Sequence, residues 1–223
     1  MIELAALDIA GTTVDERGAV YQALEESVRA AGGTPTPADV GRWMGADKRE
    51  AITAMLTSPG GPPGYDAVEA AYADFRARLA AAYAARPPAP LPGVAEAIAT
   101  LRAGGVKVAL TTGFDREVTT ALLTAVGWDN GFLDAVVCAD DVTSGRPAPY
   151  LIFRAMEATG VHDVGRVLTA GDTVRDLRAG TNAGARIVAG VLTGGQDAAT
   201  LGAVRHTHLL PSVASIPALL SLR

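Results

Sequence analysis

The chain has 223 residues, of which 49% are hydrophobic and 19% are charged, and its formal net charge is −5. This length is enough for a full core and a small second domain, and the slightly acidic charge argues against nucleic-acid and anionic-membrane partners. No apolar stretch approaches the roughly 20 residues of a membrane span. The single cysteine, Cys138, and an N-terminus without a basic region lead us to expect a cytoplasmic protein.

Five short apolar runs predict buried strands, because each is followed by glycine or by polar residues. They cover residues 2–9, 106–110, 135–138, 167–170 and 187–192. Segments with helical periodicity or rich in alanine alternate with the later runs, at 94–103, 117–126, 149–159 and 176–183. The alternation predicts an α/β fold with a doubly wound, mainly parallel, Rossmann-like sheet. Ligands of such sheets bind beyond the carboxyl ends of the strands, where the polar clusters of this sequence fall.

Residues 18–85 interrupt this alternation and are predicted to be helical throughout. The expected helices cover residues 19–31, 37–43, 48–56 and 67–85, and a proline-rich segment at 87–93 closes the block. We therefore expect a core domain formed by residues 1–16 and 90–223. A helical cap domain, residues 17–89, is inserted after the first strand and covers the site. The apolar stripe on 19–31 leaves open a homodimer through the cap.

Two motifs at the ends of predicted strands suit a phosphoryl group. Asp8 ends the first strand and is followed by Gly11 and Thr12, so one carboxylate oxygen can act as a nucleophile while the loop amides hold phosphoryl oxygens. Thr112 and Gly113 follow the second strand and offer a hydroxyl and an amide. Each string is also common in ordinary turns, so neither is decisive alone.

Two further motifs add a fixed cation and a pair of acids. Arg146 lies in a proline-rich loop before a helix and can neutralise a phosphoryl group, although an exposed arginine is the simpler interpretation. Asp172 and Asp176 lie four residues apart at a strand end and helix start, where both can approach one Mg²⁺ ion. Asp172 could also cap the helix. Four such motifs in order, each after its own strand, are improbable by coincidence.

The order Asp-x-x-x-Thr, Thr-Gly, Arg-Pro and Gly-Asp-x-x-x-Asp resembles the haloacid dehalogenase superfamily along the whole chain. The resemblance implies that Asp8 forms an aspartyl-phosphoryl intermediate and that Thr112 and Arg146 hold the phosphoryl group. It implies Mg²⁺ bound by Asp8, Asp172 and the carbonyl of Ala10, with Asp176 positioning a metal-bound water or Arg146. A C1-type helical cap is also implied.

One departure narrows the reaction. Most phosphatases of the superfamily carry a second aspartate where this chain has Ala10. The run from Asp8 to Asp15, and Met-Gly-x-x-Lys at Met44 to Lys48, resemble the phosphonatase branch, the phosphonoacetaldehyde hydrolases. In that branch the lysine forms a Schiff base with the substrate aldehyde, and the imine accepts the electron pair of the broken carbon–phosphorus bond.

The surroundings of Lys48 favour a neutral amine. Asp47 to Glu50 predict a helix start at Lys48, where the helix dipole and the neighbouring Arg49 both disfavour a cation. A solvated lysine on the cap surface is the competing interpretation. Two residues depart from the phosphonatase pattern, since Ala51 replaces its histidine and Phe114 its tyrosine.

Three functions remain open. The first is cleavage of a small phosphonate of the phosphonoacetaldehyde type by an Mg²⁺-dependent hydrolase. The second is hydrolysis of a small phosphate monoester with the same nucleophile. The third is a catalytically weak phosphate-binding regulatory protein that retains the fold.

Overall fold

The computed structural model describes residues 1–222 and contains a six-stranded parallel sheet with strand order β5-β4-β1-β6-β7-β8. The strands are β1 (Leu4–Asp8), β4 (Lys107–Thr111), β5 (Ala135–Val137), β6 (Val167–Gly171), β7 (Ile187–Val191) and β8 (His208–Leu210). The chain order reverses beside β1, which pairs with both β4 and β6. The doubly wound parallel sheet predicted from the sequence is confirmed.

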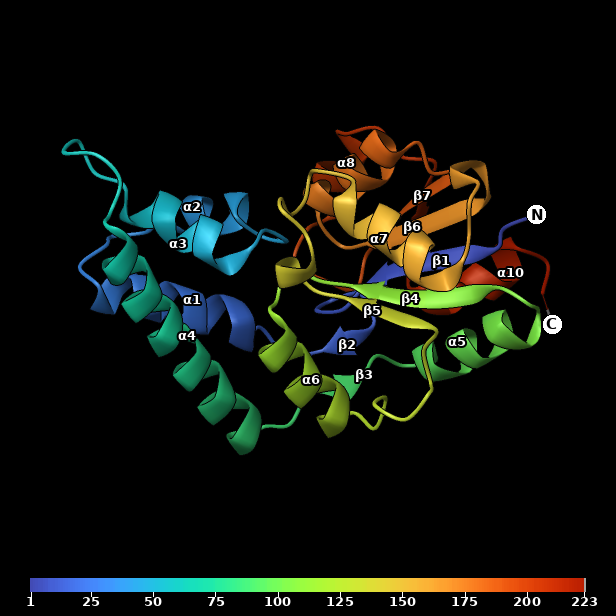
Figure 1. Ribbon diagram of the computed structural model, residues 1–223, viewed down its shortest axis with the longest axis horizontal. Helices are drawn as coiled ribbons and strands as arrows, with labels where there is room; N and C mark the ends of the chain where they lie inside the picture. Colours follow the sequence, from blue (N-terminus) through green and yellow to red (C-terminus); the bar gives the residue numbers. More distant parts are fainter. Residues whose placement is uncertain (223) are drawn as a thin grey trace.

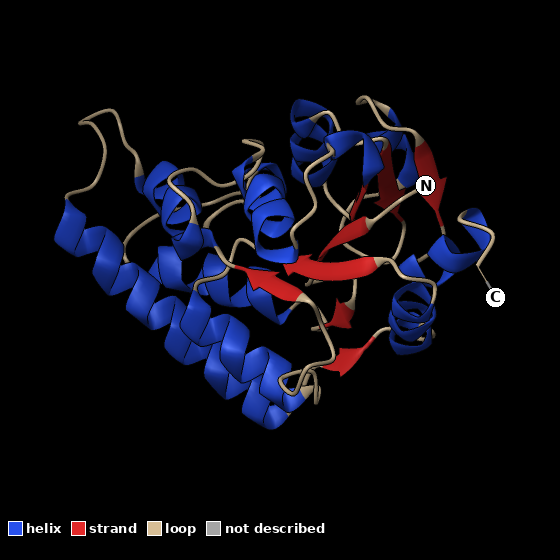
Figure 2. Ribbon diagram, turned by 45° about the vertical axis from the view of Figure 1, so that its right-hand side comes forward, coloured by secondary structure: helices blue, strands red, loops and turns tan. Residues whose placement is uncertain are grey.

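Helices cover both faces of this sheet (Figures 1 and 2). Leu4 and Ala109 pack against α7 (Tyr150–Thr159) and α8 (Val174–Ala183). Leu7 and Leu110 point to the opposite face, toward α5 (Val94–Ala103), α6 (Arg116–Ala125) and α10 (Ile216–Leu219). Because successive side chains of a strand alternate between faces, a continuous apolar run is what a sheet covered on both sides requires. The remaining short elements of the core are η1 (Ala139–Asp141), η2 (Val164–Arg166), α9 (Ala198–Gly202) and η3 (Val213–Ser215).

Four helices form a separate group beside the sheet (Figure 1). They are α1 (Ala19–Ala30), α2 (Pro37–Arg42), α3 (Lys48–Leu56) and α4 (Tyr65–Ala85). The long helix α4 packs against α1 and α3 through fully buried side chains, among them Leu24, Ile52 and Phe75. The four helices agree with the predicted ones to within two residues at each end.

The chain passes between the sheet and the helical group twice. The two connecting segments pair with each other as short antiparallel strands, β2 (Val14–Asp15) and β3 (Ala89–Pro90). From the sequence only a proline-rich connection at residues 87–93 was predicted here, because a two-residue strand leaves no periodic signal. The pair lies at both boundaries of the cap domain proposed for residues 17–89. Among residues 1–222, no helix is long and apolar enough to cross a membrane.

Candidate active site

The parallel register brings the predicted motifs to one edge of the sheet. Asp8 pairs with Thr111 at the end of β4, so Thr112 and Gly113 follow directly beside it. On the other side, Leu7 pairs with Ala170, one residue before the end of β6 and two before Asp172. Residues 160 positions apart in the chain therefore meet, as Thr12 and Asp172 do.

Arg146 lies at the centre of this edge and is 4% exposed. Its Nη1 donates to Asp8 Oδ1 at 2.7 Å, and its Nε is 2.9 Å from Asp176 Oδ1. Its Nη2 donates to the carbonyl and the hydroxyl of Thr111, at 2.8 and 2.7 Å. The guanidinium thus has fixed partners on three elements. Asp176 contacts Arg146, which is one of the two roles expected for this aspartate.

Asp172 lies on the other side of Asp8 and is 1% exposed. Its Oδ1 accepts from the Thr12 hydroxyl at 2.9 Å and its Oδ2 from the Gly195 amide at 3.0 Å. A Cβ at Gly194 would lie 1.9 Å from Asp172 Oδ2, so only glycine permits this approach.

The expectation that Asp172 could also cap α8 is wrong. Thr173 is the N-cap residue, and it forms a capping box with Asp176. The cap therefore falls one residue later than expected, which leaves both carboxylate oxygens of Asp172 facing Thr12 and Gly195 rather than α8.

The three carboxylates carry more negative charge than the protein compensates. Asp8, Asp172 and Asp176 each offer an oxygen within 4.8 Å of the others, and all three are buried. Burial raises the pKa of Asp8 to about 6, although Arg146 opposes it. Burial also raises the pKa of Asp172 to about 8, and the charges of Asp8 and Asp176 act in the same direction. Buried oxygen ligands with unbalanced charge suit a hard divalent cation such as Mg²⁺.

Lys48, in the helical group, interacts electrostatically with Asp8 and Arg146 at this edge of the sheet. It begins α3, with Asp47 as N-cap, and its side chain is buried, at 4% exposure. Its Nζ donates to the carbonyl of Ala46 at 2.8 Å and lies 5.2 Å from the centre of the Phe114 ring. Burial lowers the pKa of Lys48 to about 8 despite the opposing charges of Asp47 and Asp8.

The lowered pKa agrees with the neutral amine expected from the sequence, and burial is its largest cause. The guanidinium of Arg49, the neighbour expected to disfavour the cation, pairs with Glu69 and stacks on Tyr72. The positive charge that adds to the effect of burial is Arg146. Ala51, one turn along α3, is fully buried, and Phe114 is 2% exposed. These two departures therefore place buried apolar side chains where the phosphonatase pattern has a histidine and a tyrosine.

The loop between α2 and α3 packs directly on the core. A Cβ at Gly113 would lie 2.6 Å from the carbonyl oxygen of Ala46, and a Cβ at Gly45 would lie 2.4 Å from the Thr173 hydroxyl. Met44 Sδ would be 3.0 Å from a Cβ at Gly195. These approaches place the cap against the strand ends in a closed arrangement.

Gly113→Ala is expected to keep this loop from closing. The substitution requires no unusual backbone angle, so its cost comes from the contact with Ala46. We expect kcat/KM to fall by roughly 10- to 100-fold, because displacement of a catalytic group by about 1 Å has this effect. Steady-state assays check this, with Gly41→Ala as the control, since its added Cβ meets nothing within 4 Å. An equal, small effect of both variants would contradict the packing argument.

Further residues, outside the four predicted motifs, surround the acids. A cavity of about 230 Å³ beside Asp172 is also lined by Glu16, Tyr21 and the residues 193–195. The Thr193 hydroxyl donates to the carbonyl of Gly11 at 2.7 Å and so ties the loop after β7 to the Asp8 loop. Thr193 directly follows the strand predicted at residues 187–192, and Gly194 and Gly195 were expected either to shape the edge of a cleft or to turn the chain. Glu16 and Tyr21 lie on no recognisable motif.

Comparison with known proteins agrees with this geometry. The sequence model of the haloacid dehalogenase-like hydrolases matches residues 2–184. Phosphonoacetaldehyde hydrolase of Bacillus cereus (strain AH820) is 30% identical over 207 residues, which are 88% of this chain and 78% of the relative. A phosphonoacetaldehyde hydrolase-like protein of Syntrophobacter fumaroxidans is 36% identical over 107 residues, covering 48% of this chain and 38% of the relative.

Solved structures share the fold. A hydrolase from Pseudomonas syringae superposes with a TM-score of 0.87 at 21% identity, over 99% of this chain and 98% of the other. A phosphonoacetaldehyde hydrolase-like protein from Oleispira antarctica gives 0.82 at 23% identity, over 99% and 91%. The chain is a hydrolytic enzyme that belongs to the haloacid dehalogenase-like hydrolases, and it is similar to the phosphonoacetaldehyde hydrolases.

Proposed function

We propose that this hydrolase requires Mg²⁺ and cleaves the carbon–phosphorus bond of a small phosphonate that carries an aldehyde or ketone. The observation that carries this proposal is the buried amine of Lys48, held by the cap loop that packs on Gly113. The relatives named as phosphonoacetaldehyde hydrolases support the substrate class. A panel of phosphonates and phosphate esters, assayed for phosphate release, tests it.

Asp8 is the proposed nucleophile. Its Oδ1 is held by Arg146 at 2.7 Å, which fixes the carboxylate at the strand end. The phosphoryl oxygens would lie against the Gly11 and Thr12 loop, Thr112, Gly113 and Arg146, whose charge offsets that of the phosphoryl group. Met44, which packs on Gly195, would border the substrate from the cap side.

The acids fit a magnesium ion. Asp8, Asp172 and the carbonyl of Ala10 are the proposed ligands, and Asp176 supports the group through Arg146. When bound, Mg²⁺ would balance the charge of the carboxylates and of the phosphoryl oxygens. Burial and the charges of Asp8 and Asp176 raise the pKa of Asp172, so a cation beside this carboxylate would be favourable.

Lys48 would activate the substrate. Its neutral amine adds to the carbonyl carbon and loses water to form a protonated imine. As Asp8 bonds to phosphorus, the carbon–phosphorus bond breaks and its electron pair moves toward the imine nitrogen, giving an enamine. Protonation of the enamine and hydrolysis of the imine release the aldehyde or ketone. A second water hydrolyses the aspartyl phosphate.

This route accounts for Ala10. The leaving carbon delivers its electrons to the imine, so no acid is needed two residues after the nucleophile. A phosphate monoester, in contrast, leaves as an alkoxide that an acid should protonate. Monoester hydrolysis remains the second candidate. It is favoured by Ala51 and Phe114, which stand where the phosphonatase pattern has a histidine and a tyrosine. If this candidate is correct, Lys48→Ala leaves turnover nearly unchanged.

Activity on a phosphonate aldehyde is expected to rise with pH around the pKa of Lys48. The nucleophile is the neutral amine, and burial places its pKa at about 8 instead of 10.5. The protonated form dominates below this value, so kcat/KM should increase from about pH 7 to 9 and then level. A profile measured at constant ionic strength checks this. A rising limb near pH 10 would show that the amine is solvated.

Removal of divalent cations is expected to abolish turnover, and Mg²⁺ should restore it. Mg²⁺ should also raise the melting temperature, because an ion bound only to the folded state stabilises it by mass action. Thermal melts with and without Mg²⁺ measure the second effect without any substrate. Asp172→Asn should remove most of the Mg²⁺-dependent shift, whereas Asp66→Asn, a change at an exposed acid in the first turn of α4, should retain it. A shift unaffected by Asp172→Asn would place the ion elsewhere.

A further inference from the structure

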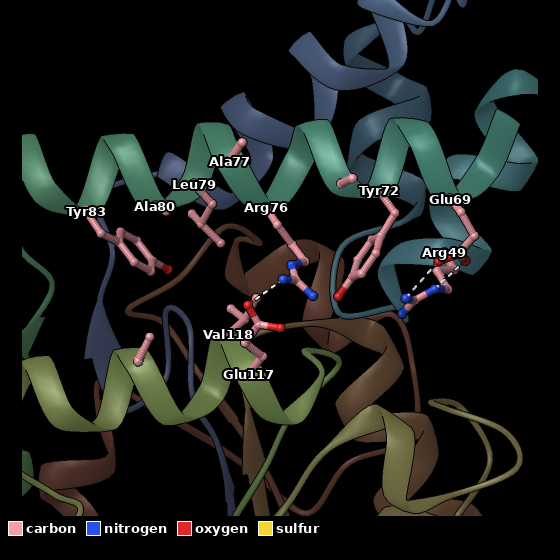
Figure 3. Close-up of a pocket in the computed structure, with 12 residues that line it drawn as sticks. Arg49, Glu69, Tyr72, Arg76, Ala77, Leu79, Ala80, Tyr83, Glu117 and Val118 are labelled. Atoms are coloured by element: carbon pink, nitrogen blue, oxygen red, sulfur yellow. Dashed lines mark hydrogen bonds and ion pairs between the residues drawn. The ribbon is translucent and has the colours of Figure 1, made fainter. Parts of the chain in front are cut away.

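The long cap helix α4 faces α6 of the core across a groove (Figure 3). The groove encloses about 470 Å³, and small side chains line much of it, including Ala73, Ala77 and Ala80 of α4 and Ala121 of α6. These alanines are too short to fill the space between the helices. Polar side chains connect the two helices near the end of the groove that adjoins α3, where Tyr72 and Arg76 point from α4 toward the core (Figure 3).

Tyr72 is the buried member of this connection. It is 3% exposed, and its hydroxyl donates to Asp115 Oδ2 at 2.6 Å. Burial and the bond to Asp115 raise the pKa of Tyr72, so the hydroxyl stays protonated and remains a donor. Arg76 also reaches Asp115, at 3.5 Å, and pairs with Glu117, but Arg76 and especially Glu117 are much more solvent-exposed. Exposed ion pairs contribute little, so the Tyr72 bond is the stronger tie.

The ring of Tyr72 holds the start of α3. The guanidinium of Arg49 lies 3.8 Å from the centre of the ring, and Glu69 of α4 accepts from Arg49 Nε at 2.6 Å. Arg49 directly follows Lys48 in the first turn of α3. The position of α4 is therefore transmitted to the residue beside the proposed Schiff-base lysine.

Asp115 is the residue of the core that accepts the hydrogen bond from Tyr72. Its Oδ1 accepts from the Val118 amide at 2.9 Å and so caps α6, which leaves Oδ2 for Tyr72. Asp115 ends the short loop that contains Thr112, Gly113 and Phe114. The ring of Phe114 lies 5.2 Å from Lys48 Nζ. The residues that Tyr72 contacts, Arg49 and Asp115, thus lie next to Lys48 and next to the phosphoryl-binding loop, which must come together in the active site.

We propose that Tyr72 is a positioning residue, which fixes the Lys48 amine over the phosphoryl-binding loop through its hydrogen bond to Asp115 and its stack with Arg49. This inference rests on the proposed function of Lys48. Tyr72 lies in the groove between α4 and α6, and its hydroxyl is already bonded to Asp115. It acts by aligning the amine, and misalignment of a reacting group costs rate more than binding.

Tyr72→Phe tests the hydroxyl alone, because the ring and its stack with Arg49 remain. Tyr83→Phe is the matched control: Tyr83 lines the same groove from the same helix, and within residues 1–222 its buried hydroxyl has no hydrogen-bond partner. We expect Tyr72→Phe to lower kcat on a phosphonate aldehyde by roughly 10- to 100-fold with a smaller change in KM. The rising limb of its pH profile should move above 8 as the amine gains solvent. Tyr83→Phe should match the wild type.

The partner is tested by Asp115→Ser, which retains an N-cap hydroxyl but has no second oxygen to accept from the Tyr72 hydroxyl. In the Tyr72→Phe background it should add little further loss, because both changes break the same bond. Additive losses, or equal behaviour of Tyr72→Phe and Tyr83→Phe, would overturn the proposal.

A measurement without substrate separates this proposal from the function of Lys48. Trp43 of the cap stacks on Arg175 of α8 at 4.6 Å, so its fluorescence reports cap contact with the core. In a Trp128→Phe background, Trp43 is the single tryptophan. Tyr72→Phe should increase its quenching by acrylamide, and Tyr83→Phe should not. If the wild type forms no imine, the proposed function fails, and the quenching comparison still decides whether Tyr72 positions the cap.

Discussion

Asp8→Asn is expected to lower kcat/KM by roughly 10⁴-fold or more on every substrate of the enzyme. The carboxamide cannot form the aspartyl phosphate, and loss of a covalent nucleophile has effects of this size. The fold should survive, because asparagine has the same shape and one charge fewer lies beside Asp172 and Asp176. Phosphate release in single-turnover and steady-state assays measures the loss, and a thermal melt confirms folding.

Asp66→Asn is the control for this variant. Asp66 is an exposed acid in the first turn of α4, and the same change there should alter kcat/KM by less than about twofold. Retention of more than about 1% of activity by Asp8→Asn would remove Asp8 as the nucleophile. A wild type without turnover on any phosphonate or phosphate ester would instead support the regulatory phosphate-binding protein.

Lys48→Arg is expected to abolish cleavage of a phosphonate aldehyde, by roughly 10³-fold or more, while phosphate ester hydrolysis changes by less than about threefold. Arginine stays protonated in the buried position and forms no imine. The contrast between the two substrates separates loss of the Schiff base from damage to the Asp8 site. Equal losses on both substrates would contradict a specific role for the amine.

Borohydride reduction gives a direct chemical test of the same residue. The chain has two lysines, Lys48 and Lys107, so the site of a reduced adduct can be assigned by peptide mass. The side chain of Lys107 is 54% exposed, lies 3.4 Å from Asp134 and begins β4 at the opposite end of the strand from the site. Substrate-dependent trapping should occur in Lys107→Arg and be lost in Lys48→Arg. Trapping that persists in Lys48→Arg would contradict the proposed imine between Lys48 and the substrate.

Much of the core could be predicted because its signals are local. Each strand is a short apolar run closed by a polar residue, and burial on both faces of a parallel sheet requires such runs. Asp8, Arg146 and Asp172 could be proposed as neighbours because parallel strands present their carboxyl ends at one edge. The β2–β3 pair could not be predicted, since two residues carry no periodicity. The helix cap at Thr173 was missed because Asp172 and Thr173 are both good N-cap residues and adjacent.

By itself the sequence determined the family, the order of strands and helices, and the residue types that can attack phosphorus beside a divalent cation. Tertiary structure alone decided that Lys48 is buried and that Arg49 turns away toward Tyr72. It also showed that Asp176, expected beside Arg146 or a metal-bound water, contacts Arg146. The physical reason is that pKa values and pair contacts depend on burial and on neighbours distant in the chain. Such contacts leave no trace in the spacing of residues along one segment.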